Sequence, residues 1–263
     1  MVQAYDNAIL CTGAAYRVIL KRNLNTDGAV DFETSDRQRI VSHPLSIGFY
    51  DPETGRSVLL AQVKDSQGVI VSSNSIVYAD AFEGNGIKAS VTYRYGLGAW
   101  HQDVTFTKWP RSLTPASFNM GDQTRIEVIT EILESPKPSV TVHYLKRETD
   151  TAKRERMVEP DFVDETIRYG TEMALRLGRA FQGGTNHSPM AGIPVGKQLL
   201  KWMAGHCSWR QWNGIAPRRN WPKCSRQRPF RRNQCQPRSQ DDNCPNLDWF
   251  RANRCLLRND WLK

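Results

Sequence analysis

Residues 78–108, YADAFEGNGIKASVTYRYGLGAWHQDVTFTK, decide the fold class of this chain. Apolar residues recur at every second position in both halves of the stretch: Ile87, Ala89, Val91, Tyr93 and Tyr95, then Trp100, Val104 and Phe106. A period of two places such residues on one face of a β-strand and the residues between them on the other. Gly96-Leu97-Gly98 separates the halves, as a tight reversal does. The stretch predicts a β-hairpin whose apolar face is covered by a second layer.

Short strands with turns about every 10 residues are expected on both sides of this hairpin, which is typical of antiparallel all-β proteins. Upstream, we expect strands at residues 15–21, 39–50 (interrupted at Pro44), 57–64 and 68–77. Residues 24–35 are predicted to be a polar loop around Asp27-Gly28. Downstream, strands are expected at residues 125–133, 140–145, 166–181 and 196–202. The spacing in 125–133 also suits a helix, but its β-branched residues favour a strand.

The composition changes abruptly after Trp202. Residues 203–263 contain no Glu, Val, Thr or Tyr, but hold five of the six cysteines and five of the eight tryptophans. Their eleven Arg and two Lys against four Asp account for the whole formal charge of +9, so residues 1–202 are neutral. We therefore predict an all-β, antiparallel, sandwich-like domain over residues 1–202, incomplete if the chain is a fragment. Residues 203–263 are predicted to be a disordered basic tail.

A single missing nucleotide explains this change. Restoring one G after the Trp202 codon allows a frame that reads Trp-Asp-Gly and then a strand-like run, whereas the given frame shows neither a strand nor a helix period. We expect residues 203–263 to be derived from a frameshift. The domain would then lack strands that complete its fold, exposing edges and apolar faces.

The beginning of the chain does not resemble a signal peptide, because it lacks a basic region and Asp6 interrupts any apolar run. No apolar stretch approaches the roughly 20 residues that span a bilayer. Cys11 is the only cysteine before residue 203, so this part has no intrachain disulfide. We expect the chain to start partway through a larger protein, whose remainder is its partner. The residues predict neither an oligomeric state nor a localisation.

Several ungapped phrases carry a family resemblance. They are GFYDPETGRSVLLAQVKDS (48–66), YADAFEGNGIKASVTYRY (78–95), AWHQDVTF (99–106), RIEVITEIL (125–133), EPDFVDETIRYG (159–170), LGRAF (177–181) and PVGKQLLKW (194–202). In this order they resemble a β-rich segment upstream of the repeats in large bacterial RHS/YD-repeat proteins, over roughly residues 47–202. The resemblance implies a secreted or surface-exposed, mainly structural role. The defining YD repeats are absent, and no family catalytic residue is carried over.

No G-x-S-x-G, H-E-x-x-H, G-x-G-x-x-G or P-loop motif occurs, so we predict neither an enzyme nor a cofactor. Zinc binding by His206 and the cysteines of the tail is disfavoured because no C-x-x-C pair occurs. His43, His101 and His143 fall on separate predicted strands, where Asp103 or Glu131 could complete an acid/base pair. We expect these polar side chains to face water instead.

Two binding functions remain as alternatives to a structural role. Tyr93, Tyr95 and Trp100 could form an aromatic platform for carbohydrate or another surface. They fall, however, on the same strand face as the apolar Val91 or Val104, which favours packing in the core. The tail could bind nucleic acid non-specifically, because arginine neutralises phosphate and aromatic rings stack on bases. The candidate residues for this binding are Arg218, Arg219, Arg231 and Arg232.

Overall fold

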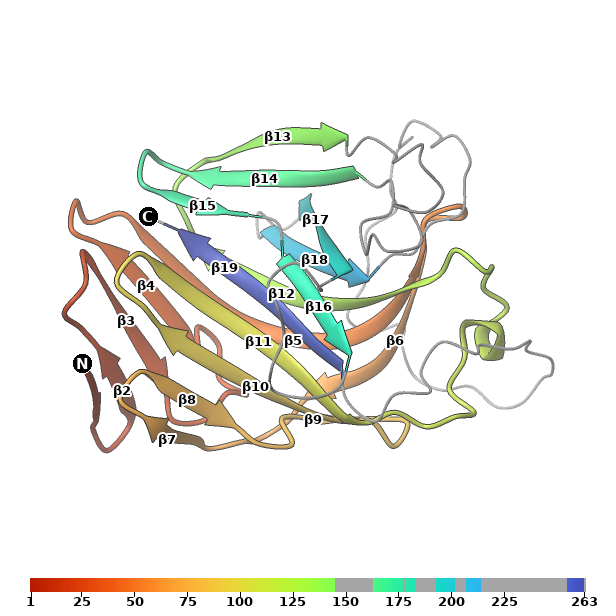
Figure 1. The fold of residues 1–263 in the computed structure, drawn as a ribbon, viewed down its shortest axis with the longest axis horizontal. Coiled ribbons are helices and arrows are strands. Elements are labelled where there is room, and N and C mark those ends of the chain that lie inside the picture. Colours follow the sequence, from red (N-terminus) through yellow and green to blue (C-terminus); the bar gives the residue numbers. More distant parts are fainter. Residues whose placement is uncertain (145–162, 177, 183–192, 202–206, 214–254, 263) are drawn as a thin grey trace, which may run out of the picture.

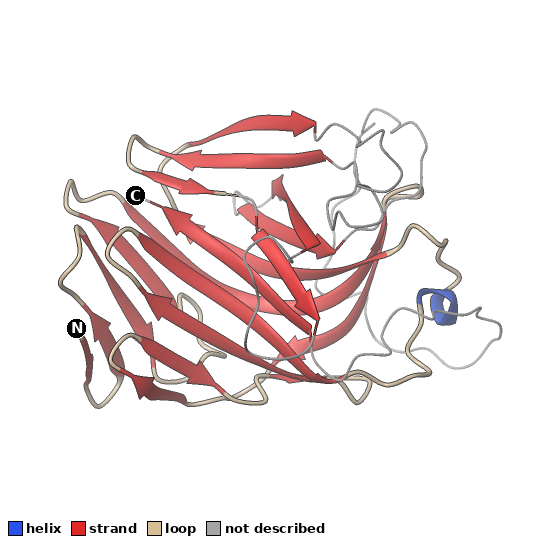
Figure 2. Ribbon diagram, in the orientation of Figure 1, coloured by secondary structure: helices blue, strands red, loops and turns tan. Residues whose placement is uncertain are grey.

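The computed structural model describes residues 1–144, 163–176, 178–182, 193–201, 207–213 and 255–262. Within these ranges the chain forms nineteen β-strands, one 3-10 helix, η1 (Pro115–Phe118), and no α-helix (Figures 1 and 2). All the strand pairings are antiparallel. The predicted all-β, antiparallel fold class is therefore confirmed.

The hairpin at residues 78–108 forms as its alternation predicts. Strand β10 (Lys88–Tyr95) pairs with β11 (Ala99–Lys108), and the register places Tyr95 opposite Trp100 and Val91 opposite Val104. The apolar residues of both strands are buried, with Trp100 only 1% exposed. Between the strands, the Gly96 N–H donates to the Ala99 carbonyl at 3.0 Å and closes the turn.

The remaining strands have the following bounds. Before the hairpin they are β1 (Val2–Ala4), β2 (Ala8–Cys11), β3 (Tyr16–Lys21), β4 (Val30–Thr34), β5 (Arg39–Asp51), β6 (Arg56–Val63), β7 (Gly68–Ser72), β8 (Ser75–Tyr78) and β9 (Phe82–Glu83). After it they are β12 (Arg125–Glu134), β13 (Pro138–Tyr144), β14 (Val163–Tyr169), β15 (Met173–Leu175), β16 (Gly178–Gln182), β17 (Ile193–Lys201), β18 (Cys207–Asn213) and β19 (Cys255–Leu262).

Hydrogen-bonded neighbours run in the order β1-β2-β3-β4-β5-β12-β18-β17-β16-β19-β11-β10-β8-β7. The first half of β5 pairs with β4 and its second half with β6, while β12 follows β5 along most of its other edge. Strands β13, β14 and β15 add a further antiparallel unit that meets β19. Strand pairing thus provides hydrogen-bond partners for most backbone N–H and C=O groups of the strands.

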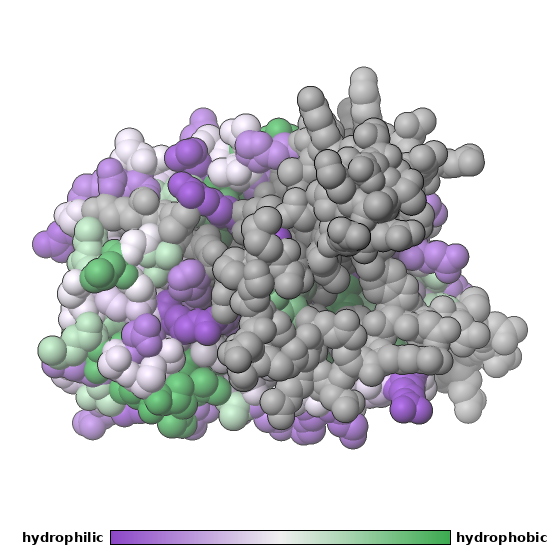
Figure 3. Space-filling model, in the orientation of Figure 1, coloured by the Kyte–Doolittle hydropathy of each residue, from purple (hydrophilic) through white to green (hydrophobic). Residues whose placement is uncertain are grey.

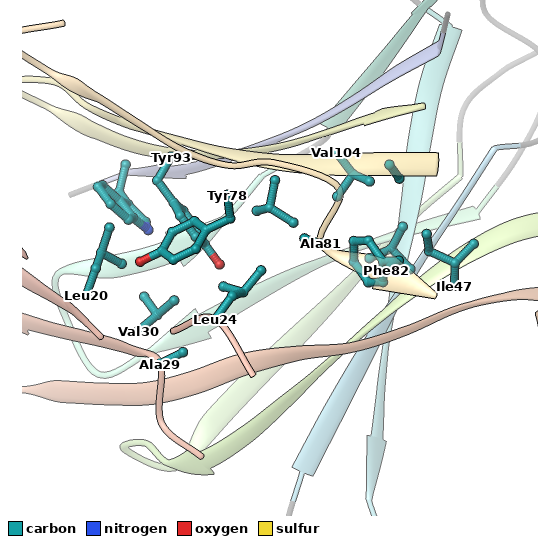
Figure 4. Close-up of a cluster of buried hydrophobic side chains, with 14 of the residues drawn as sticks. Leu20, Leu24, Ala29, Val30, Ile47, Tyr78, Ala81, Phe82, Tyr93 and Val104 are labelled. Atoms are coloured by element: carbon teal, nitrogen blue, oxygen red, sulfur yellow. The ribbon is translucent and has the colours of Figure 1, made fainter. Parts of the chain in front are cut away.

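The core lies between two facing layers of strands (Figure 4). Leu20, Val30 and Ile47 come from strands β3, β4 and β5, and they face Tyr93 and Val104 from β10 and β11. Neither layer alone could bury its apolar face, so the two layers stabilise each other by packing face to face.

The structure corrects three of the expected elements. Residues 24–35 are not all loop, because Val30–Thr34 form β4, in which Val30 and Phe32 alternate with acidic residues. The expected strand at 68–77 is two strands, β7 and β8, joined by a turn at residues 73–74. The expected strand at 166–181 spans parts of β14, β15 and β16. Because these strands are short and the turns between them are close, the alternation of apolar and polar residues continues across the turns and does not mark where each strand ends.

Strand β5 passes through Pro44 without ending. Its register with β12 shifts at this point, so that Thr130 faces Pro44, Ile129 faces Ser46 and Leu45 has no facing residue. Such a β-bulge accommodates a proline, which cannot donate to the strand ladder. The interruption predicted at Pro44 is therefore a bulge within one strand.

Two stretches of the C-terminal segment are strands. Strand β18 lies between β12 and β17, and β19 lies between β11 and the pair β15 and β16. The rest of the expected disordered tail, residues 203–206, 214–254 and 263, lies outside the described residues.

Candidate functional site

The structure brings together one of the histidine–carboxylate pairs considered from the sequence. His43 on β5 lies directly opposite Glu131 on β12, and its Nε2 is 3.5 Å from the Glu131 Oε2. The His43 Nε2 is also 3.8 Å from the Asp27 Oδ1, in the turn between β3 and β4. His43 is only 4% exposed, so the expectation that it faces water is wrong. A buried imidazole between two carboxylates is the arrangement in this fold that most resembles an acid/base site.

The backbone of Gly28 determines which nitrogen of His43 carries the proton. The Gly28 N–H points at the His43 Nδ1, with a nitrogen–nitrogen distance of 3.4 Å. An Nδ1 that accepts a hydrogen bond holds no proton, so the neutral ring carries its proton on Nε2. That proton faces the Glu131 and Asp27 carboxylates.

Gly28 has a conformation that its position requires. Its φ is +67°, and a Cβ there would lie 2.7 Å from the Val41 Cγ1. A left-handed φ and the lack of room both favour glycine. This close approach to β5 brings the Gly28 N–H to the ring of His43.

These contacts give His43 a structural role. A general base needs a nitrogen that can reach the proton it abstracts. In His43 one nitrogen is directed at a backbone N–H and the other at carboxylates, and the ring is buried. We define His43, Glu131, Asp27 and Gly28 as the His43 clamp, because together they join the β3–β4 turn to strands β5 and β12.

The same face of β5 and β12 continues with further buried polar groups. Register places Glu127 opposite Gly48 and Arg125 opposite Tyr50, and all four residues are buried. A Cβ at Gly48 would lie 3.1 Å from the Glu127 Oε1, so the side chain of Glu127 covers this glycine. Burial lowers the pKa of Arg125 to about 10, while the nearby Tyr50 acts in the opposite direction. Arg125 therefore stays charged at neutral pH.

The other sequence candidates are dispersed. Asp103 is buried, against our expectation that it faces water, and it forms an ion pair with Arg94 on the neighbouring strand β10. His101 lies opposite Arg94 and is partly exposed. The His143 Nε2 is 2.8 Å from the Thr166 Oγ1 across β13 and β14, at an exposed position. His101 and His143 are therefore not members of the His43 clamp.

The three candidate platform aromatics lie in the core. Tyr93 and Trp100 stack with their ring centroids 5.1 Å apart and an interplanar angle of 8°. The Tyr95 hydroxyl donates to the Tyr16 carbonyl and accepts from the Ala14 N–H, each at 2.8 Å. All three are buried, as core packing predicts, whereas a sugar platform needs exposed rings.

The other binding candidates lie outside the described residues or find no support within them. Arg218, Arg219, Arg231 and Arg232 of the tail are not described, nor is His206. Among the residues that the structure describes, no group of three or more His, Cys, Asp or Glu side chains could hold a metal ion. In these same ranges no helix is long and apolar enough to cross a bilayer.

The sequence matches no protein-family model and no curated protein.

Proposed function

We propose that this chain is a non-catalytic structural segment of a large, secreted or surface-exposed protein similar to the RHS/YD-repeat family. The observation that carries the proposal is the His43 clamp. Among the described residues, His43 and Glu131 most resemble an acid/base pair, but their contacts join the β3–β4 turn to strands β5 and β12. The ordered phrases of residues 47–202 support the family part of the proposal.

The architecture gives the proposal further support. Between residues 2 and 201, the described residues form seventeen antiparallel strands and only one short helix. The ion pair of Arg94 with the buried Asp103 and a bulged central strand consolidate the sheet. Such a strand scaffold supports a role in shaping a longer chain by fold-level analogy alone, because one fold can serve many functions.

The test is to resequence the coding DNA across the Trp202 and Met203 codons and to read the frame that follows. We expect a missing nucleotide, and downstream of it an open frame that encodes tyrosine- and aspartate-containing repeats. DNA identical to the given frame, with no repeats beyond it, contradicts the proposal.

Nucleic-acid binding by the tail needs a test that leaves the fold intact. Truncation after Trp202 is unsuitable, because it removes β18 and β19 together with their pairings to β12, β17 and β11. The substitution of Arg218, Arg219, Arg231 and Arg232 by glutamine removes the charge and keeps both strands. Under the structural proposal, the unchanged chain binds single-stranded DNA only weakly, and the variant loses no more affinity and salt dependence than the removal of four positive charges explains.

A further inference from the structure

The second edge of β11 is covered by the end of the chain. Strand β11 pairs with β10 along one edge and, from Ala99 to Phe106, with β19 along the other. Figure 1 shows β19 lying between β11 and β16. Residues 214–254 separate β19 from β18 in the sequence, so no short turn fixes how β19 aligns with β11. The alignment therefore depends on the residue types that lie opposite each other in the two strands.

The apolar positions of β19 match the core face of β11. The register places Leu257 opposite Val104 and Trp261 opposite Trp100. Val104 and Trp100 are each 1% exposed. Residues directly opposite each other in an antiparallel pair lie on the same face of the sheet. Apolar alternation alone does not fix the register, however, because a shift of β19 by two residues keeps every residue on its own face.

A buried amide interrupts the core face of β11. Gln102 is 4% exposed and lies between Trp100 and Val104 on this face. Its Oε1 accepts a hydrogen bond from the Tyr93 hydroxyl at 3.2 Å, whereas among the described residues its buried Nε2 has no hydrogen-bond partner. A buried donor without an acceptor is costly. The register places Asn259 directly opposite Gln102, and an asparagine side chain carries the acceptor that this donor needs.

A buried carboxylate follows on the opposite face of β11. Asp103 is 1% exposed, forms an ion pair with Arg94 of β10 and lies opposite Arg258 of β19. Figure 3 shows hydrophilic side chains gathered over β10 and β11. On its other side, Arg258 lies opposite Arg179 of β16. Of the two residues opposite Arg258, Asp103 is therefore the one that attracts its charge.

These two polar residues discriminate between alignments of β19. A shift of two residues in one direction places Asp260 opposite Asp103, so that two carboxylates meet. The same shift places Asn259 opposite the apolar Val104. A shift in the other direction places Leu256 opposite Asp103. Of the three alignments, only the observed one gives both polar residues of β11 an opposite residue of matching chemistry.

The geometry points to Gln102 and Asp103 as the residues that select a docking strand for the edge of β11. The occupant is the C-terminal segment, residues 255–262, recognised by an asparagine and an arginine at adjacent positions within an apolar alternation. This inference goes beyond the proposed structural role, which assigns no residue to closing the sheet. It does not depend on the reading frame, because in a restored frame this edge would require a strand of the same pattern.

Disulfide trapping in the full chain tests the alignment. Cys255 lies directly opposite Phe106, and directly opposite residues fall within the Cα–Cα range of about 4.4–6.8 Å that a disulfide needs. We expect Phe106→Cys to link to Cys255 on mild oxidation, as mapped by mass spectrometry of the peptides. Val104→Cys is the matched control, because it lies opposite Cys255 only after a shift of two residues.

The less buried pair Thr105→Cys/Leu256→Cys repeats the trapping if Phe106→Cys does not fold. Linkage of Val104→Cys to Cys255 as efficient as that of Phe106→Cys overturns the alignment. The absence of linkage in both Phe106→Cys and the Thr105→Cys/Leu256→Cys pair also overturns it.

A double-mutant cycle tests the selection itself. Gln102→Leu and Asn259→Leu each leave one amide opposite an apolar residue, whereas the double variant replaces both amides by apolar groups. We expect each single variant to lower the urea midpoint of the full chain, and the double variant to have a higher midpoint than either. Losses that add in the double variant overturn the role of Gln102.

Discussion

The strand pairs β10–β11 and β5–β12 are both long and antiparallel, but they differ in what covers their faces. Strands β10 and β11 bury one face with Tyr93, Trp100 and Val104, and much of their other face is partly exposed. Strands β5 and β12 bury Ile47 and Val128 on one face and charged groups such as Glu127 on the other. A polar residue in a strand therefore does not by itself mark a solvent-facing position.

The first pair was predictable for a physical reason. Its strands are adjacent in sequence, and a single buried face produces a clean alternation of apolar and polar residues. Strands β5 and β12 are separated by more than 70 residues, so no local signal pairs them. Burial on both faces also blurs the alternation, which is why residues 125–133 fitted a helix as well as a strand.

The candidate site was predictable only in part. The sequence showed that His43 and Glu131 could meet, but it assigned both to water-facing positions. The missing signal was Gly28, whose left-handed backbone brings an N–H to His43. Asp27-Gly28 was recognised as a turn, but turn chemistry does not reveal which strand the turn packs against.

The largest expected effect is in the core of β10–β11. Replacing Trp100 by alanine removes a fully buried ring that stacks on Tyr93, and we expect it to lower the free energy of unfolding by about 3–5 kcal/mol. Urea denaturation measures this change. Leu97→Ala, in the exposed turn, is the control and should cost less than about 0.5 kcal/mol. A loss below about 1 kcal/mol for W100A would show that this hairpin is not central to the core.

A smaller effect is expected from the glycine of the His43 clamp. Gly28 and Gly55 have φ values of +67° and +69°, so alanine at either position incurs a strain of about 1 kcal/mol. Only at Gly28 would the new Cβ also meet the Val41 side chain, whereas nothing lies within 4 Å at Gly55. We expect Gly28→Ala to destabilise the chain by about 2–3 kcal/mol and Gly55→Ala by about 1 kcal/mol. Equal losses in urea denaturation would contradict a role for the clamp.

Alkaline pH distinguishes the buried tyrosines of the hairpin core. Burial raises the pKa of Tyr93 well above its ordinary value of about 10. Above pH 10 the unfolded chain releases this proton while the folded chain keeps it, so stability is present below pH 10 and is lost as the pH rises. Above pH 10, we expect the free energy of unfolding of the Tyr93→Phe variant to fall less steeply with pH, by up to about 1.4 kcal/mol per pH unit. Tyr5→Phe, at an exposed position, is the control, and equal pH slopes for both variants would contradict the prediction.

The smallest effect is expected at the solvated edge of the hairpin. The Asp80 Oδ2 lies 2.8 Å from the Nζ of Lys64 and 2.8 Å from the Nζ of Lys88, and these hydrogen bonds lower the pKa of Asp80. Because the three side chains are partly exposed, we expect Asp80→Asn to cost no more than about 1 kcal/mol. The difference should shrink in 1 M salt on thermal unfolding. A larger loss of unfolding free energy that does not depend on salt would mean that these charges are as buried from solvent as the charged groups of β5 and β12.

The central claim is that His43 and Glu131 act together to hold the fold. A double-mutant cycle with His43→Leu and Glu131→Gln, measured by urea unfolding, tests it most directly. We predict a coupling of about 1–2 kcal/mol, because each substitution removes the partner of the same buried contact. Losses that simply add, within about 0.3 kcal/mol, would contradict the account.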